Sequence, residues 1–333
     1  MKIRLRHNFE DLISVENLLK AWQEFASGKR SKLDVQKFSA DLFDNILQLH
    51  NQLANKTYRH GGYYNFNISD PKPRKISKAS VQDRLVHHAV YRVLYPFFER
   101  TFIADSFSCR IDKGTHKSVN RFLRMFRQAS HNNTKGCWVL KCDIKKFFAT
   151  IDHEILINIL EKYIPDKDII WLVRDIISSF STSPGVGLPL GNLTSQLFVN
   201  VYMNEFDQYV KHKLKARYYI RYADDFVFLS QDRNWLLRLL PDIRNFLYDR
   251  LKLAIHPTKI KIKSFGSGVD FLGWVNFPTH KVLRTTTKNR MLRRVREHPT
   301  FETLQSYLGL LEHGNTAKVS KELLNTYWLF IKR

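Results

Sequence analysis

Residues 216–230, ARYYIRYADDFVFLS, place two apolar, aromatic-rich runs on either side of a short polar centre, YADD at 222–225. Both runs are rich in residues that favour β-strands. Only about three residues remain to reverse the chain, which predicts a β-hairpin with Asp224 and Asp225 at an exposed tip. Because Asp is also a common turn former, this stretch alone fits either a solvated turn or a functional site.

The composition is that of a globular protein with a strongly basic balance. Of the 333 residues, 44% are hydrophobic and 26% are charged. The 54 Lys and Arg residues against 31 Asp and Glu leave a formal net charge of +23. A polyanionic partner that releases counterions on binding explains this excess, so nucleic acid is the first candidate and an anionic membrane surface the second.

Neither a signal peptide nor a membrane span is predicted, because the most apolar run, residues 169–173, is stopped by Arg174. Three cysteines are too few for a disulfide framework and suit a reducing compartment. We therefore expect a cytoplasmic protein without a membrane partner.

A third carboxylate, Asp143, ends the strand predicted over residues 138–144, WVLKCDI. The alternation along this strand places Val139, Lys141 and Asp143 on one face. A carboxylate at the end of a mostly buried strand is costly unless it is paired or bound to a metal. Asp143 is therefore a better site candidate than an ordinary surface acid.

A glycine-rich loop, GVGLPLGNLTSQ at 185–196, lies between these acids. Its glycines allow the backbone to approach a ligand closely, and a helix is expected from about Thr194. Neither the Walker order nor the GxGxxG order is present. The loop could still cradle a nucleotide.

Basic segments surround this centre. Residues 8–56 predict a basic helical lead-in, and residues 71–78 an extended cationic segment, which fits either a solvated loop or a phosphate clamp. Residues 258–264 predict a strand whose one face carries Lys259, Lys261 and Lys263. A later helix gathers arginines opposite its apolar side, which fits either a phosphate-tracking face or a solvated one.

Asp143, Asp224 and Asp225 form the set that two-metal phosphoryl transfer requires. Two Mg²⁺ ions about 4 Å apart share carboxylate oxygens, one activating a 3′-hydroxyl and the other steadying the leaving pyrophosphate. Mn²⁺ is an alternative to Mg²⁺. The basic surface would then track template and primer.

The motifs KCDIKKFF (141–148), GLPLGNLTSQ (187–196), YADD, the Lys259 segment and FLGW (271–274) occur in the order and approximate spacing of the reverse transcriptase motifs. Over roughly residues 60–280 the sequence resembles that family. Leu190 stands where retroviral and group II intron enzymes usually have Gln, and Gln196 where they have Pro. This departure resembles the reverse transcriptases of diversity-generating retroelements.

The resemblance implies an α+β, right-hand polymerase fold. Its expected parts are a basic helical N-terminal segment (1–60), fingers (61–136), a palm with an antiparallel sheet and interleaved finger elements (137–276), and a short basic helical thumb (277–333). The implied activity is RNA-directed DNA polymerase, with template RNA, a cDNA primer and dNTPs as partners. A small basic accessory protein and a structured RNA are further implied partners.

The resemblance also implies individual roles. Asp143 and Asp224 would be the main metal ligands, supported by Asp225 and the Ile144 carbonyl. Lys259 would protonate pyrophosphate, and Phe148 would be the aromatic gate that excludes a 2′-hydroxyl. The other implied substrate-binding residues are Lys72, Arg74, Arg110, Leu190, Gly191 and Gln196. Those implied to bind nucleic acid are Phe271, Leu272, Gly273 and Trp274 of the primer grip and Arg290, Arg293 and Arg294 of the thumb.

Leu190 bears on the subtype, because it cannot supply the hydrogen bonds of the usual Gln. The resemblance therefore implies misincorporation opposite template adenine. Two alternatives stay open: a reverse transcriptase of a bacterial anti-phage defence system, and a non-catalytic RNA-binding protein that kept the fold. Three intact carboxylates argue against the second, since binding alone does not require them.

Overall fold

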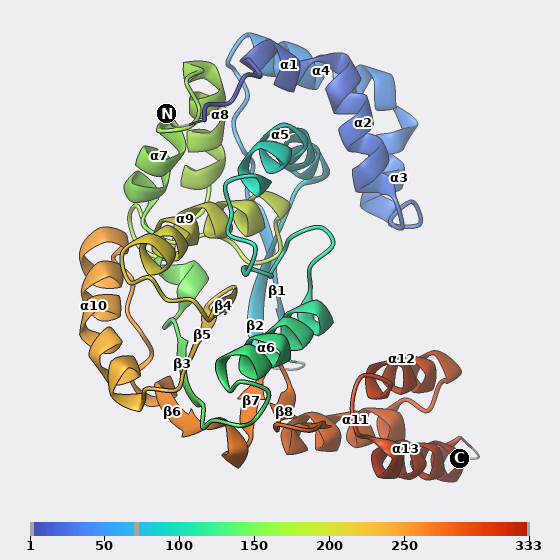
Figure 1. Ribbon diagram of the computed structural model, residues 1–333. Helices are drawn as coiled ribbons and strands as arrows, with labels where there is room; N and C mark the ends of the chain where they lie inside the picture. Colours follow the sequence, from blue (N-terminus) through green and yellow to red (C-terminus); the bar gives the residue numbers. More distant parts are fainter. Residues whose placement is uncertain (1–2, 70–72, 332–333) are drawn as a thin grey trace. The chain divides into compact units, whose positions relative to one another are not determined.

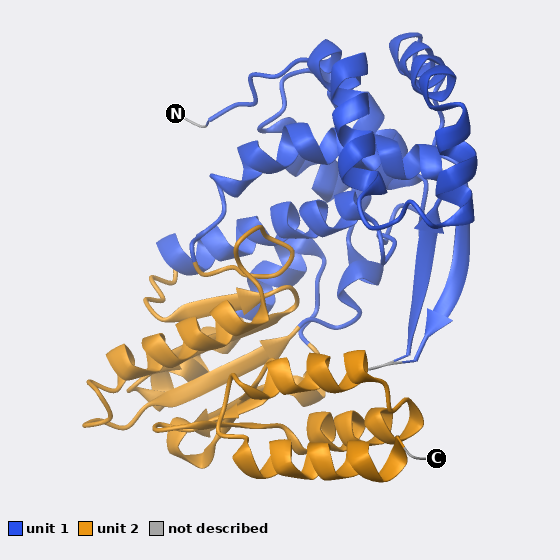
Figure 2. Ribbon diagram, turned by 90° about the vertical axis from the view of Figure 1, so that its right-hand side faces the viewer, with its two compact units in different colours: residues 1–104, 144–213, 243–255 blue, residues 105–143, 214–242, 256–333 orange. Residues whose placement is uncertain are grey.

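The computed structural model describes residues 3–69 and 73–331. Contacts divide the chain into two compact units (Figure 2). The first unit comprises residues 1–104, 144–213 and 243–255, and the second comprises residues 105–143, 214–242 and 256–333. Each unit is therefore assembled from three separate stretches of sequence.

The first unit begins with the predicted helical lead-in, which is confirmed. Its helices are α1 (Phe9–Ile13), α2 (Val15–Ala26), α3 (Leu33–Ala40) and α4 (Leu42–Ala54), and α2 packs on α5 (Val81–Glu99). Side chains of Asn8, Ser14 and Ser80 cap α1, α2 and α5, as expected for residues at helix starts. The basic interruption at residues 29–32 separates α2 from α3.

Strands β1 (Tyr63–Ile68) and β2 (Arg74–Ala79) form an antiparallel pair between α4 and α5 in the sequence. The cationic segment is thus a strand from Arg74 onward, because it finds a partner for its backbone hydrogen bonds. The predicted contact Lys72 lies outside the described residues.

The rest of the first unit holds the glycine-rich loop. It contains the 3₁₀ turn η1 (Phe147–Thr150) and the helices α7 (His153–Glu161), α8 (Lys167–Ser178) and α9 (Leu193–His212). The Asp152 side chain caps α7 by accepting a hydrogen bond from the Ile155 N–H at 3.0 Å. Helix α9 is largely buried and packs on α5.

A four-stranded antiparallel sheet is the centre of the second unit, in the order β4-β5-β3-β6. The strands are β3 (Trp138–Asp143), β4 (Tyr219–Tyr222), β5 (Asp225–Ser230) and β6 (Lys261–Ser264). Helix α6 (Thr115–Ala129) packs against β4 and β5 (Figure 1). The sheet and helices confirm the α+β class and the hairpin.

The chain ends in a small sheet and three helices of the second unit. These are β7 (Val269–Phe271), β8 (Trp274–Asn276), β9 (Lys281–Leu283), α11 (Thr285–Glu297), α12 (Phe301–Leu311) and α13 (Ala317–Phe330). One hydrophobic cluster joins α6, the four-stranded sheet and these helices. The division into fingers, palm and thumb stays a prediction, and its boundaries at 136 and 276 do not coincide with those of the units.

The long helix α10 (Arg233–Leu251) contributes residues to both units. Among the helices of residues 3–69 and 73–331, none has the length and hydropathy of a membrane-spanning segment.

Lys259 does not lie on a strand, so that prediction was wrong. Residues 257–259 form the 3₁₀ turn η2 (Pro257–Lys259), and β6 begins only at Lys261. Pro257 lacks a backbone N–H for the sheet and has a fixed φ, both of which favour the turn.

Candidate active site

Strand register brings together the acids that are far apart in the sequence. In the β3–β5 ladder Asp143 is directly opposite Asp225, and Asp224 precedes it in the turn between β4 and β5. Residues directly opposite in an antiparallel pair share one face of the sheet. The three carboxylates predicted for the site therefore occupy one end of the sheet in the second unit.

Two lysines accompany these carboxylates. The Lys259 Nζ lies 2.7 Å from Asp143 Oδ1, and the Lys141 Nζ lies 3.6 Å from Asp225 Oδ1. Lys259 was predicted for the site, whereas Lys141 was placed on the same face as Asp143 but given no role. The alternation of β3 was the signal that could have found it.

Burial and repulsion by neighbouring carboxylates raise the pKa values of two of the acids, Asp224 and Asp225. Burial, followed by the charges of Asp143 and Asp225, raises the pKa of Asp224 to about 6. Burial also raises the pKa of Asp225, and Lys141 partly offsets this effect. The expected exposed tip is instead half-buried, because Asp225 is already part of a ladder with strands on both sides.

Arg221, a residue that the sequence analysis did not predict for the site, stabilises the turn between β4 and β5. Arg221 is 1% exposed, and its Nη1 donates a hydrogen bond to the carbonyl of Ala223 at 3.1 Å. Ala223 has a φ of +53°, a conformation that is unfavourable for a residue with a Cβ. The buried guanidinium thus holds the backbone immediately before Asp224, and an Arg within an apolar strand was the available signal.

The charges at this end of the sheet fit divalent cations. Within residues 3–69 and 73–331, no three His, Cys, Asp or Glu side chains are gathered in the geometry of a metal site. Asp143 is paired with Lys259. The pKa values of Asp224 and Asp225 are raised, which indicates that nearby cations do not fully compensate the charges of these two carboxylates. Oxygen donors with uncompensated charge are the ligands that Mg²⁺ prefers.

In the first unit, the glycine-rich loop is fastened to the cationic strand β2. The Ser77 N–H donates to the Leu190 carbonyl at 3.0 Å, and Asn192 Nδ2 donates to the Ser77 carbonyl at 3.1 Å. Gly191 has a φ of +110°, and a Cβ there would lie 2.8 Å from Ile76 Cγ2. This position therefore requires glycine.

Phe148 and Gln196 also lie along this loop. The Phe148 carbonyl accepts a hydrogen bond from the Leu188 N–H at 2.8 Å, which ties η1 to the loop. Gln196 lines a cavity of about 330 Å³ together with Gly191 and residues of α2, β1, β2 and α5. Phe148, Gly191 and Gln196, three of the predicted substrate-binding residues, therefore all contact or belong to the glycine-rich loop of the first unit.

The predicted site residues divide between the two units. Asp143, Asp224, Asp225, Lys259 and Arg110 belong to the second unit, whereas Ile144, Arg74, Phe148, Leu190, Gly191 and Gln196 belong to the first. Arg110 is engaged locally, because its Nη1 donates to the Ser106 carbonyl and hydroxyl at 2.7 and 2.8 Å. Its predicted contact with substrate stays a prediction.

The predicted primer grip is mostly core. Phe271 and Trp274 are buried, and the residues between them form a tight turn with φ values of +51° at Leu272 and +88° at Gly273. Of these four residues, Leu272 and Gly273 are partly exposed, and the contact of the grip with nucleic acid stays a prediction.

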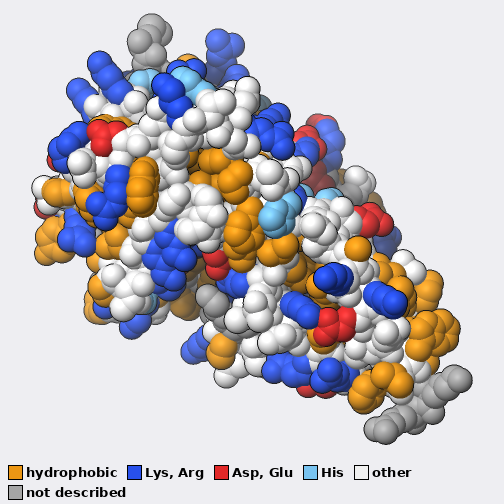
Figure 3. Space-filling model, turned by 60° about the horizontal axis from the view of Figure 1, so that its bottom comes forward, with side chains coloured by type: hydrophobic (Ala, Val, Ile, Leu, Met, Phe, Trp, Pro, Cys, Tyr) orange, Lys and Arg blue, Asp and Glu red, His pale blue; other side chains and the backbone are white. Residues whose placement is uncertain are grey.

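Helix α11 has the two faces that the sequence predicts. Met291, Leu292 and Val295 are buried, whereas Arg293 and Arg294 are exposed and Arg290 is half-buried. Figure 3 shows Lys and Arg side chains spread over the face drawn there, with few Asp and Glu among them. The positive charge therefore lies on the surface, where a polyanion can reach it.

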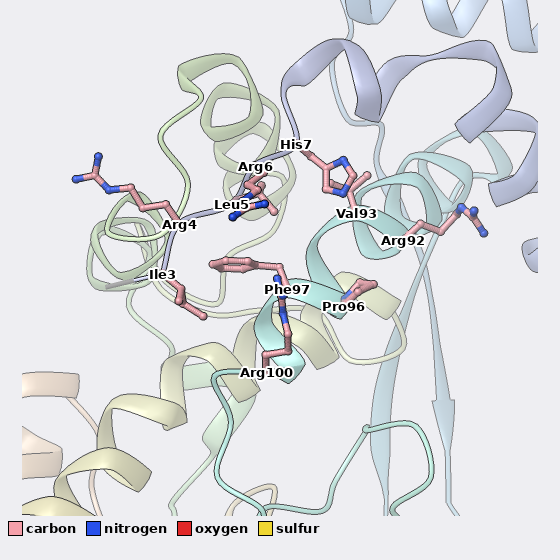
Figure 4. A pocket seen from close by; sticks show the side chains of 10 residues that line it. All are labelled: Ile3, Arg4, Leu5, Arg6, His7, Arg92, Val93, Pro96, Phe97 and Arg100. Atoms are coloured by element: carbon pink, nitrogen blue, oxygen red, sulfur yellow. The ribbon is translucent and has the colours of Figure 1, made fainter. Parts of the chain in front are cut away.

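A larger cavity, of about 1370 Å³, lies elsewhere in the first unit. Figure 4 shows residues of the N-terminal segment, among them Arg4 and Arg6, opposite Phe97 and Arg100 of the α5 region. Among the described residues, none of those predicted for the site lines this cavity. Size alone therefore does not identify the active site.

Comparison with known proteins agrees with this geometry. Residues 68–276 match the model of the family "Reverse transcriptase (RNA-dependent DNA polymerase)". The chain is 25% identical over 269 residues to protein YkfC of Escherichia coli (strain K12), covering 69% of this chain and 68% of that protein.

Intron-encoded proteins are also similar. The chain is 25% identical over 194 residues to the group II intron-encoded protein LtrA of Lactococcus lactis, which covers 56% of this chain and 29% of LtrA. It is 26% identical over 110 residues to nuclear intron maturase 1 of Arabidopsis thaliana, covering 32% and 14% respectively. Because the family model spans most of the chain and includes both the carboxylate hairpin and the glycine-rich loop, this chain belongs to the reverse transcriptase family of RNA-directed DNA polymerases.

Proposed function

We propose that this chain copies an RNA template into cDNA by two-metal nucleotidyl transfer. The observation that supports this mechanism is the register that sets Asp143 opposite Asp225, with Asp224 adjacent and its pKa raised. Binding RNA does not require three mutually repelling acids at one sheet end, whereas holding two dications does.

In this proposal Asp143, Asp224, Asp225 and the Ile144 carbonyl hold two Mg²⁺ ions. When bound, the ions supply an activated 3′-hydroxyl and neutralise charge on the leaving pyrophosphate. Lys259, beside Asp143, donates a proton to that pyrophosphate, and Arg221 keeps the turn that carries Asp224 in place.

The first unit would select the incoming nucleotide. Phe148 excludes a 2′-hydroxyl, and Arg74, with Lys72 and Arg110, binds triphosphate or template. Leu190, Gly191 and Gln196 shape the pocket for the base pair. The Leu272–Gly273 turn and the exposed arginines of α11 hold primer and template.

Leu190 suggests an enzyme of low fidelity from a diversity-generating retroelement. The loop is held to Ser77 through the Leu190 carbonyl and the Asn192 side chain, and the Leu190 side chain lacks the amide with which the usual Gln forms hydrogen bonds. Template RNA, cDNA primer and dNTPs are then the substrates, and a small basic accessory protein and a structured RNA are further partners.

A second candidate is a reverse transcriptase that acts with an intron RNA. The names of the intron-encoded relatives favour it. The chain spans less than a third of LtrA, so that protein's further activities do not transfer by themselves.

The central test is Asp224→Asn in primer extension on RNA. We expect Mg²⁺-dependent extension to fall by at least about a thousandfold, because a ligand of the reacting centre is lost, while RNA binding changes less than about twofold. Asp232→Asn, an exposed acid in the loop after β5, is the matched control and should extend normally. Undiminished extension by Asp224→Asn would exclude the mechanism.

Sequencing of cDNA made on a defined RNA separates the two candidates. The retroelement proposal predicts errors concentrated at template adenines, and fewer of them in Leu190→Gln. An even error spectrum that Leu190→Gln leaves unchanged would favour the intron candidate.

A further inference from the structure

One face of the β1–β2 hairpin combines exposed aromatic rings with cations. The register sets Tyr64 opposite Lys78 and Phe66 opposite Ile76, so these four side chains share a face. Tyr64 is 72% exposed and Phe66 39% exposed, with ring centroids 6.1 Å apart. Exposed aromatic rings beside cations form the usual platform for single-stranded nucleic acid.

This face continues into the cavity of about 330 Å³ that also contains Gly191 and Gln196. Phe66, Ile76 and Lys78 line it from the hairpin. The other cations in its wall are Lys29, in the turn after α2, and Arg84 on α5, and among its described lining residues none is acidic. The cavity is therefore suited to an anion.

An aspartate from outside the cavity wall holds two of these cations. One oxygen of Asp34, Oδ2, lies 2.7 Å from both Lys78 Nζ and Arg84 Nη2. These two cations lower the pKa of Asp34, although burial opposes them. A single anionic oxygen shared by a lysine and an arginine is also how a phosphate oxygen is bound.

The helix that carries Asp34 is lightly anchored. Among the described residues of α3, only Val35 is buried, and Leu33 is 68% exposed. The Lys78–Asp34 pair joins side chains that are 39% and 37% exposed, so it contributes little and is screened by salt, whereas the Arg84 side chain is only 18% exposed. A phosphate that pairs with the same two cations would compensate for the loss of both ion pairs, so a polyanion can replace the Asp34 carboxylate at small cost.

We propose that Lys78 and Arg84 bind a phosphodiester of single-stranded RNA whose bases stack on Tyr64 and Phe66. In the RNA-free protein Asp34 occupies the phosphate position, and incoming RNA displaces it. The inference rests on the proposed function for the identity of that strand, which is the template beside the glycine-rich loop.

The first test measures binding of a fluorescent 20-nucleotide oligouridylate in EDTA without dNTPs. Asp34→Asn should tighten binding by about three- to tenfold, because the internal competitor is removed. Glu16→Gln is the matched control, since it changes the charge equally and frees Lys20, which pairs with Glu16 at 2.5 Å. Equal tightening in both variants, or none in Asp34→Asn, would overturn the proposal.

The second test separates the two faces of the hairpin. Lys78→Gln should weaken binding and lower the salt slope by about one, and the double variant Asp34→Asn/Lys78→Gln should lose most of the gain. Lys75→Gln is the control, because Lys75 is an exposed lysine on the opposite face of β2. Tyr64→Ala should weaken binding with an unchanged salt slope. Identical effects of Lys78→Gln and Lys75→Gln would contradict the site.

These measurements are independent of catalysis. Without Mg²⁺ they report binding alone, so a failure here with intact Mg²⁺-dependent extension removes only this site. Conversely, if Asp34→Asn binds oligouridylate more tightly but the wild-type protein extends no primer, the polymerase proposal is refuted and the RNA-binding site stands. Tightening seen with duplex RNA but not with oligouridylate would also refute the assignment to a single strand.

Discussion

The carboxylate end of the second unit and the glycine-rich loop of the first are held in place by different means. A ladder running from Trp138↔Ser230 to Asp143↔Asp225 fixes the acids, and Arg221 secures the turn between the strands. The loop is fastened to β2 at Ser77 by two hydrogen bonds and depends on a glycine without space for a Cβ. If the proposed function is right, catalysis depends on the strand ladder, and nucleotide selection depends on a few local contacts that substitutions can alter.

The largest effect in this comparison is expected for Arg221→Met, which tests whether Arg221 helps the strand ladder to position Asp224. If the buried guanidinium positions Asp224, kcat for primer extension should fall about a hundredfold, with the KM for dNTP changed less than about threefold. Arg217→Met, an exposed arginine on the same segment, should have no such effect. A normal kcat in folded Arg221→Met would show that the ladder alone positions the turn.

Phe148→Ala tests whether the first unit selects dNTPs over rNTPs. Loss of the ring should lower discrimination between dNTP and rNTP by about ten- to a hundredfold, as expected for one steric contact. The ratio of extension efficiencies with the two nucleotide sets measures this directly. The neighbouring Phe147→Ala removes a buried ring and should leave the ratio unchanged. Unaltered sugar discrimination in Phe148→Ala would refute the gate.

The repulsion among the acids should appear as a pH-dependent stability. The pKa of Asp224 in the folded protein is about 6, above its ordinary value of 3.8, so the folded state binds more protons between these values and loses stability as pH rises through them. In EDTA at pH 7.5, Asp224→Asn should therefore raise the free energy of unfolding by about 1–2 kcal/mol after allowance for solvent screening.

This gain should disappear at about pH 3, well below both pKa values, where the wild-type carboxyl is mostly protonated in the folded and the unfolded state. Denaturant titrations of the wild type and Asp224→Asn, at pH 7.5 and at the low pH, measure this difference in the free energy of unfolding. Asp232→Asn provides the contrast, because the Trp235 N–H lowers the pKa of Asp232 and its removal should not stabilise. A gain that is equal at both pH values would indicate a cause other than charge.

The smallest effect concerns the arginine face of α11. Arg293→Gln and Arg294→Gln should each flatten the dependence of RNA affinity on salt by about one. Lys318→Gln, an exposed lysine on α13 outside that face, is the control. An unaltered slope in the arginine variants would indicate that this face is merely solvated.

Much of the second unit was predictable because strand and helix periods are local properties. Alternation identified the hairpin and β3, and the helical period separated Met291 and Val295 from the arginines of α11. Lys259 was misplaced because Pro257 imposes a local turn that alternation does not reveal. Lys141 was missed because its partner Asp225 lies far away in the sequence, and Arg221 because its hydrogen bond to the Ala223 carbonyl exists only once the turn has folded.

The sequence by itself determined which residues are candidates for the chemistry, namely three acids, a lysine and a glycine-rich loop with Leu190, in an order that resembles the reverse transcriptase family. Only the tertiary structure decided which of them meet. Register sets Asp143 against Asp225, and a pair of hydrogen bonds joins Ser77 to a loop 115 residues away. The reason is physical, since side-chain period depends on neighbouring residues, whereas register and docking depend on long-range burial and pairing.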